Sequence, residues 1–230
     1  ASRLTVLYGE SGVGKSSILR AGVARELRRV APEADVVVYD TWSDDPLGPL
    51  VDLDEAGEAY LILDQFEEYF VYHRPPDAPG SLVAELPELL RRAPRTNVLI
   101  AVREDALAQL DAFTGRIPNV FANHLRLDHL DRAAAQEAIR GPLARWQELT
   151  GESVEAESEL VEAVLDEARA GRDAADGRDG RDGAGRIEAP FLQLVLERIW
   201  TEEREAGSSV LQLATLKRLG GAEAIVRDHL

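Results

Sequence analysis

The chain has 230 residues, of which 45% are hydrophobic and 30% are charged, and its formal net charge at pH 7 is −16. This composition fits a globular protein with one large domain or with a core and a smaller satellite, and the acidic charge argues against a protein that wraps nucleic-acid backbone. The sequence has no cysteine, which excludes disulfides and thiolate metal sites, and its apolar runs are far too short to span a membrane. The absence of cysteine fits the cytoplasmic location that we expect, no signal peptide is recognisable, and the charge leads us to expect no direct nucleic-acid binding.

Strand-like and helix-like segments alternate over the first 130 residues. Short apolar runs rich in β-branched residues predict strands, and apolar residues at helical spacing predict helices. This alternation predicts a three-layer α/β/α core with a mostly parallel sheet. Residues 40–57 are polar and contain prolines, with room for one short helix. The predicted strands are residues 3–8, 35–39, 59–63 and 97–102, with a shorter fifth at 124–127, and the predicted helices are 15–29, 66–72, 82–92 and one that starts at 104–110.

The pattern changes after residue 130, where amphipathic helices are predicted and no strong strand. We therefore predict a core at residues 1–130, followed by an all-helical lid subdomain at residues 131–230, with a further helical element starting near residue 220. Residues 170–186 alternate arginine and aspartate with glycine and carry almost nothing apolar. Such a segment buries too little surface to offset its chain entropy, which predicts a flexible insertion. A lid whose arginines close on a nucleotide is the alternative.

A glycine-rich loop lies between the first predicted strand and the first predicted helix and matches the phosphate-binding pattern G-x-x-x-x-G-K-[ST]. Its glycines let successive backbone N–H groups point into one concavity, and the N-terminus of the following helix favours anions. Lys15 can reach the β- and γ-phosphates of a nucleotide, the Ser16 hydroxyl can bind Mg²⁺, and Ser17 can contact the α-phosphate. A strand-to-helix turn with an incidental lysine is the alternative. The predicted nucleotide-binding residues of this loop are Gly9, Glu10, Ser11, Gly12, Val13, Gly14, Lys15, Ser16 and Ser17.

Acidic residues follow the third predicted strand. Asp64 directly follows the apolar run YLIL, where a nucleotide hydrolase needs an acid to hold Mg²⁺, although a plain helix cap is the alternative. In many P-loop ATPases a second acid comes next and orients the attacking water, but here that position is Gln65, which cannot act as a base. Glu67 and Glu68 are the next candidates, Glu68 for positioning water and Glu67 on the metal side. A solvated surface acid is the alternative for each of them.

Arg103 directly follows the fourth predicted strand. The carboxyl ends of parallel strands line the ligand crevice, so Arg103 is predicted at the same edge of the sheet as the phosphate loop. A guanidinium there can contact a γ-phosphate and distinguish ATP from ADP. The alternative is a structural arginine that pairs with Glu104, Asp105 or another acid.

These motifs together resemble the STAND class of signal-transduction ATPases, and within it the bacterial novel STAND group, which is related to the NACHT and AAA+ ATPases. The resemblance runs in order over nearly the whole chain. Its most specific part is DQFEE, which is similar to the D-G-x-D-E form of the NACHT ATPases. The motifs that carry it are YGESGVGKSSIL at 8–19, RAGV at 20–23, DQFEE at 64–68, VRED at 102–105, IRGP at 139–142, APFLQ at 189–193 and GGAEAI at 220–225.

The resemblance implies a nucleotide-gated switch in which ADP holds a resting form, ATP opens an active oligomeric form, and slow Mg²⁺-dependent hydrolysis resets it. It also implies effector and sensor domains in the same parent chain, self-oligomerisation through the ATPase module, and a role in bacterial signal transduction or antiphage defence. Pro190 matches a lid proline that packs against the adenine. Two departures are the missing upstream segment, which helps to hold the base in the family, and the insertion at 170–186. Since the sequence has no methionine, we expect the chain to be a segment of a longer protein.

Two other functions stay open on sequence grounds. Gln65, in place of a catalytic acid, fits a scaffold that binds nucleotide without significant hydrolysis. A P-loop kinase would need lid arginines, which residues 172–186 offer. The sequence contains neither the N/T-K-x-D motif of GTPases nor the L-S-G-G-Q motif of ABC ATPases.

Overall fold

The computed structural model describes residues 3–43, 57–76, 78–176 and 186–229. They divide into two compact units, residues 1–128 and residues 129–230. Each unit has its own apolar core, and each is described by itself below.

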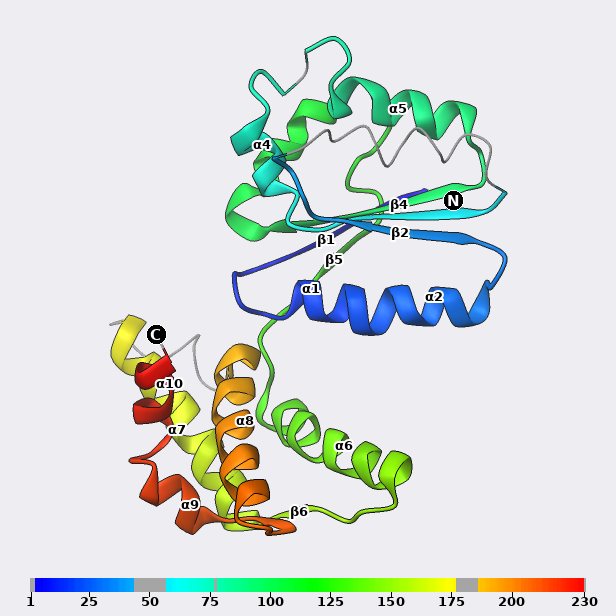
Figure 1. The fold of residues 1–230 in the computed structure, drawn as a ribbon. Coiled ribbons are helices and arrows are strands. Elements are labelled where there is room, and N and C mark those ends of the chain that lie inside the picture. Colours follow the sequence, from blue (N-terminus) through cyan, green and yellow to red (C-terminus); the bar gives the residue numbers. More distant parts are fainter. Residues whose placement is uncertain (1–2, 44–56, 77, 177–185, 230) are drawn as a thin grey trace. The chain divides into compact units, whose positions relative to one another are not determined.

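A parallel sheet of five strands forms the centre of the first unit (Figure 1). Its order is β2-β3-β4-β1-β5, and every pairing between neighbours is parallel. This topology places the first strand of the chain next to β4 and β5, so the loops that follow these strands meet at one edge. The strands are β1 (Leu4–Gly9), β2 (Asp35–Tyr39), β3 (Ala59–Leu63), β4 (Thr96–Arg103) and β5 (His124–Arg126).

Helices cover both faces of this sheet, as Figure 1 shows. One face carries a continuous helical run made of α1 (Lys15–Ser17), the π-helical η1 (Ile18–Ala24) and α2 (Arg25–Val30). The other carries α4 (Glu67–Tyr72), α5 (Leu82–Arg92) and the 3₁₀-helical η3 (Glu104–Phe113). The predicted α/β/α class with a mostly parallel sheet is therefore confirmed.

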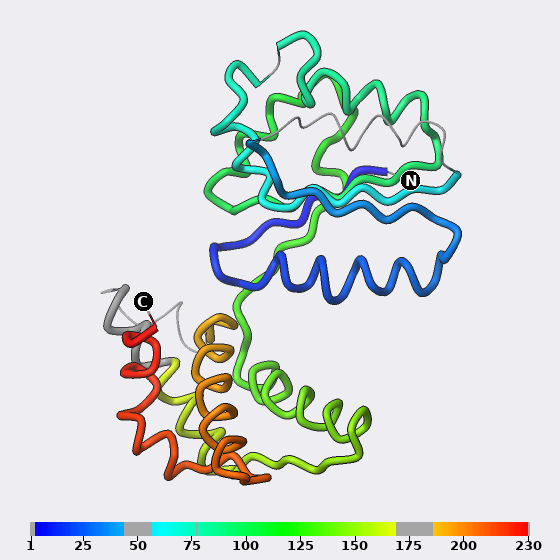
Figure 2. The backbone as a smooth tube through the Cα atoms, viewed as in Figure 1, coloured from blue at the N-terminus to red at the C-terminus, as the bar shows by residue number. Residues whose placement is uncertain are grey.

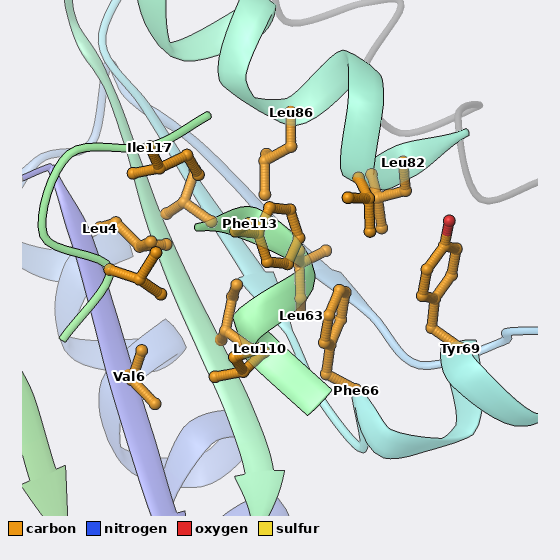
Figure 3. Close-up of a cluster of buried hydrophobic side chains, with 14 of the residues drawn as sticks. Leu4, Val6, Leu63, Phe66, Tyr69, Leu82, Leu86, Leu110, Phe113 and Ile117 are labelled. Carbon is orange, nitrogen blue, oxygen red and sulfur yellow. The ribbon is translucent and has the colours of Figure 1, made fainter. Parts of the chain in front are cut away.

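Alternation along the strands explains why the sheet is covered twice. Successive side chains of a strand point to opposite faces. Leu61 and Leu63 accordingly pack in the larger core below α4 and α5, whereas Ile62 packs with Leu19 on the other face. Figure 3 shows the larger core, in which Leu63 and Phe66 lie among side chains from α5 and η3.

The second unit is mainly helical, and Figure 2 traces α8 running beside α10 within it. Two short strands, β6 (Glu155–Ala156) and β7 (Val210–Leu211), pair in parallel. The prediction of no strong strand missed this pair, because two residues are too few to produce an alternating pattern. The helices are α6 (Arg132–Thr150), α7 (Ser158–Asp176), α8 (Ala189–Glu205), α9 (Leu213–Arg218) and α10 (Ala222–His229).

Helix α7 corrects the predicted start of the insertion. It continues to Asp176, whereas the sequence predicted a flexible segment from residue 170. Residues 168–176 contain four alanines, and alanine has the highest helix propensity, which favours extending the helix. Residues 177–185, which carry most of the Gly-Arg-Asp pattern, lie outside the described residues, as does most of the polar stretch at 40–57.

Candidate functional site

The glycine-rich loop joins the end of β1 to the start of α1. Gly12 and Gly14 have φ angles of 78° and 92°, a region that side chains with a Cβ rarely adopt. The Val13 side chain is buried beneath the loop, while Ser11 and Gly12 are exposed. Alternate left-handed residues before a helix N-terminus turn backbone N–H groups toward a common point, which favours an anion.

Lys15 folds back against this loop. Its Nζ donates hydrogen bonds to the carbonyl oxygens of Gly9 and Glu10, both at 2.8 Å. Burial lowers the Lys15 pKa from 10.5, Arg103 lowers it further, and the carboxylates of Glu67 and Asp64 partly oppose the shift. The ammonium therefore lies in the electric field of three residues from the ends of β3 and β4, which the sequence predicted to converge on the loop.

Asp64 is the buried acid of the site, with 0% of its surface exposed. Its backbone N–H donates to Tyr39 at 2.9 Å, and its backbone carbonyl accepts from the Trp42 indole at 2.8 Å. Its Oδ1 accepts from the Gln65 N–H at 2.9 Å. Its Oδ2 is buried without a hydrogen-bond partner among the described residues, and the Arg20 Nε lies 4.0 Å away. One oxygen of the carboxylate thus accepts a hydrogen bond, and the other is buried without a donor in the described part of the chain.

The unpartnered Oδ2 of Asp64 fits Mg²⁺, because this ion prefers oxygen ligands. Mg²⁺ also keeps several waters when it binds beside phosphates. A buried carboxylate oxygen without a donor is rare in folded proteins and calls for a bound ion or water. Ser16, half-buried in the first turn after the loop, offers a hydroxyl. Among the residues the structure describes, no three His, Cys, Asp or Glu side chains cluster as an all-protein metal site.

Gln65 makes a sharp turn after Asp64. Its φ of 53° is left-handed, which costs a non-glycine residue about 1 kcal/mol or more. The turn buries Phe66 completely and starts α4 at Glu67. The Phe66 N–H donates to Ala101 in β4 at 2.9 Å, which anchors the turn to the neighbouring strand.

The two glutamates differ in their surroundings. The Glu67 Oε2 accepts from the Arg103 backbone N–H at 3.1 Å, so Glu67 spans the ends of β3 and β4. Glu68 is half-buried one residue further along α4. Their catalytic roles remain predictions.

Arg103 ends β4 and stands in register with Gly9 of β1, so it lies at the same sheet edge as the loop. Its guanidinium pairs with Asp105 through Nε at 3.1 Å and Nη2 at 2.6 Å, and its side chain is 47% exposed. The pairing with Asp105 is the structural alternative stated above. A role as a γ-phosphate sensor remains a prediction.

Pro190 lies in the second unit, exposed in the first turn of α8. An apolar cavity of about 450 Å³ opens between α6 and α8, and it is lined by Ala189, Gln193 and the tryptophans Trp146 and Trp200 among others. The predicted contact of Pro190 with adenine stays a prediction.

Sequence reasoning missed two contacts of Asp64. The buried Trp42 indole donates a hydrogen bond to the Asp64 carbonyl, and Arg20 faces the Asp64 carboxylate. Arg20 is four residues after Ser16, and this spacing could have indicated that it shares the helix face of the predicted metal ligand. Trp42 offered no comparable signal, because its contact depends on the path of the chain after β2.

A glycine loop that leads from the first strand into a helix, with a buried aspartate after another strand of the same parallel sheet, defines the P-loop NTPase class. The chain belongs to the Novel STAND NTPase 1 family, whose model matches residues 1–229. The resemblance seen in the sequence is thereby confirmed, and the chain is a nucleotide-binding NTPase module. No curated protein matched the sequence.

Solved structures similar to the chain include the Aeropyrum pernix ORC2 protein in its ADP form, with a TM-score of 0.62 and 15% identity over 97% of this chain and 62% of that one. The C. elegans PCH-2 protein has a TM-score of 0.57 and 16% identity over 99% of this chain and 61% of that one. A chain of the E. coli MS115-1 HORMA:CdnC:Trip13 complex has a TM-score of 0.58 and 15% identity over 98% of this chain and 73% of that one. At these identities the similarity is one of fold, and this chain spans about three fifths of the length of the first two.

No helix among the described residues is long and apolar enough to cross a bilayer. The cytoplasmic location expected from the sequence stays a prediction.

Proposed function

We propose that the chain is the ATP-binding and slowly hydrolysing module of a signal-transduction switch in a larger bacterial protein. ADP would maintain a resting form and ATP an active, self-associated form. Effector and sensor domains in the same parent chain would produce and receive the signal, with antiphage defence as one setting. The observation that carries the proposal is the buried Asp64 carboxylate oxygen without a hydrogen-bond partner among the described residues, after β3 of the same parallel sheet whose β1 leads into the loop that Lys15 folds against.

In this proposal the phosphate loop binds the nucleotide. Backbone N–H groups of residues 9–17 and the Lys15 ammonium bind the phosphates, and Pro190 packs against the adenine. Ser16 and Asp64 hold Mg²⁺, which neutralises phosphate charge when bound. The unpartnered Asp64 Oδ2 supports this assignment.

The hydrolysis step needs a water positioned by a carboxylate. Glu68 is the proposed residue for it, because Glu67 already accepts the Arg103 N–H and is better suited to hold the ends of two strands together. Arg103 would exchange its Asp105 partner for the γ-phosphate. Both acids lie in the first turn of α4, directly after the buried Phe66. A contact of the substrate with either acid would therefore act on a helix that is anchored in the core.

Nucleotide affinity measured by calorimetry tests the binding part of the proposal. Lys15→Ala should abolish ADP and ATP binding, whereas Asp64→Asn should retain ADP binding in EDTA and lose the increase caused by Mg²⁺. Arg29→Gln is a matched control, because Arg29 lies on the same helical run and pairs only with the exposed Glu26 among the ion pairs described for it. Unchanged ATP binding in the Lys15 variant would refute the proposal.

A scaffold that binds nucleotide without hydrolysing it is the second candidate. The observation that favours it is the left-handed Gln65 in the position of a catalytic acid. Single-turnover ATP hydrolysis by the full-length parent protein separates the two, because a switch must hydrolyse one bound ATP and a scaffold does not. Glu68→Gln should stop that turnover without weakening ATP binding if the first proposal holds.

A further inference from the structure

Arg20 lies between two acids that end neighbouring strands. Its Nη2 forms an ion pair with Asp40, the residue after β2, and its Nε lies 4.0 Å from the Oδ2 of Asp64, the residue after β3. The arginine side chain is 53% exposed, Asp40 is 34% exposed and Asp64 is buried. One cation thus lies between a partly exposed carboxylate and a buried one.

The buried carboxylate needs a counter-charge when no metal is bound. An isolated ionised carboxylate is costly to bury, and its cost falls when a cation lies close by. The Lys15 Nζ donates to the Gly9 and Glu10 carbonyls, and the Asp64 Oδ2 accepts no hydrogen bond from it. Arg20 is the cation placed at the unpartnered oxygen, at a distance that gives attraction without a hydrogen bond.

The helix that carries Arg20 also carries Ser16. The two residues are four positions apart and therefore lie on one face of the helical run. Arg20 sits in the π-helical stretch η1, and π-helical turns occur often at functional sites. Arg20 therefore shares a helix face with one proposed metal ligand, Ser16, and its Nε lies 4.0 Å from the carboxylate of the other, Asp64.

We infer that Arg20 is a positioning residue that neutralises Asp64 in the metal-free protein and competes with Mg²⁺ for its carboxylate, while Asp40 draws the guanidinium away. The inference rests on the Mg²⁺ site of the proposed function. A cation at 4 Å from a carboxylate opposes a second cation there even in water-like surroundings. Mg²⁺ binding then requires Arg20 to move onto Asp40.

Two substitutions give opposite expectations. Arg20→Gln removes the competitor, so the factor by which Mg²⁺ strengthens ADP binding should rise about fivefold. Asp40→Asn leaves Arg20 with Asp64 as its remaining acid, so the same factor should fall several-fold. A purely structural arginine would move both variants in the same direction or neither, because both lose the same ion pair.

The assay is calorimetric titration of ADP with Mg²⁺ and again in EDTA, for the wild type, both variants and the control Arg29→Gln. Arg20→Lys, which keeps the charge, should stay near the wild-type factor. An unchanged factor in Arg20→Gln, or a change of the same sign in both variants, overturns the inference.

A second readout uses the nucleotide-free protein and does not depend on the proposed function. In a double-mutant cycle, Arg20→Gln should lower the ratio of folded to unfolded protein about fivefold when Asp64 is present. The same substitution should lower this ratio much less in an Asp64→Asn background. The absence of this coupling overturns the pairing, whatever the nucleotide experiments show. A wild type that binds no ADP, with the coupling present, would instead refute the proposed function and retain the pairing.

Discussion

Replacing Gly9 with alanine tests how closely the chain packs where the phosphate loop begins. A Cβ at this position would lie 2.3 Å from the Leu127 carbonyl oxygen and 3.2 Å from the Val13 Cγ2. An ordinary contact begins at 3.4 Å, so the Leu127 backbone would have to move by about 1.1 Å, which is 3.4 minus 2.3. Backbone cannot yield as a flexible side chain does, because Leu127 also donates its N–H to Tyr8 at 2.8 Å.

The expected cost combines two effects. Overpacking at a well-packed position costs about 1–3 kcal/mol. Loss of the hydrogen bond between Leu127 and Tyr8 adds about 1 kcal/mol. We expect Gly9→Ala to lower the free energy of unfolding of the first unit by about 3 kcal/mol, and to weaken nucleotide binding because the loop follows directly.

Denaturant unfolding followed by fluorescence measures this cost. Trp42 is the tryptophan of residues 1–128, and it is buried in the core, so a background with Trp146→Phe and Trp200→Phe isolates its signal. Gly22→Ala is the matched control: Gly22 is helical, exposed and has nothing within 4 Å of an added Cβ. It should gain about 0.5–1 kcal/mol. If Gly9→Ala unfolds at the wild-type denaturant concentration, the close approach to Leu127 is wrong.

Burial lowers the pKa of Lys15 from 10.5, so the lysine loses its charge at a lower pH than a free lysine does. ADP binding that needs the charged lysine should persist below this lowered pKa and should weaken as the pH rises through it, at values below 10.5. Calorimetry across that range should show no such loss in a Lys15→Arg variant that still binds. Trp42→Phe should cost about 2 kcal/mol in denaturant unfolding followed by circular dichroism, because the buried Asp64 carbonyl loses its donor; wild-type stability would contradict this. Arg204→Ala should cost the helical unit about 1 kcal/mol, and less at high salt, because Glu152 loses two hydrogen bonds at 2.6 and 2.9 Å. A salt-independent loss would point to packing over Trp200 instead.

Local sequence patterns were enough for most of the fold. The α5 helix was predicted with its bounds because its apolar residues repeat at helical spacing; in the structure Ser81 caps it by accepting a hydrogen bond from the Ala84 N–H. Strands β1, β3 and β4 are mostly apolar runs, which is typical of parallel strands covered on both faces.

Other features had no local pattern that identified them. The β6–β7 pair has no periodic signal. At residues 170–176 the glycine and aspartates argued for a loop, whereas the alanines favour the helix that the structure has. Helix η3 has 3₁₀ geometry, which apolar spacing does not distinguish from an α-helix.

The residues of the site also differ in how far the sequence could predict them. Lys15 and Asp64 belong to short motifs, so the residues next to them in the sequence were enough to identify them. The triad of Arg20, Asp40 and Asp64 joins one helix to the ends of two strands, and only the strand order brings these together.

The antiparallel bridge between Leu130 and Ile187 brings the two ends of the intervening chain together. Each residue donates its N–H to the other's carbonyl, at 3.1 and 2.8 Å, although 56 residues separate them in the sequence. These two backbone hydrogen bonds therefore join the segment before α6 to the segment before α8. Pro190 lies three residues after Ile187. A protein cut there, between Asp176 and Arg186, should stay assembled as two fragments, since Leu192, Val195 and Ile199 of α8 are buried in the shared core.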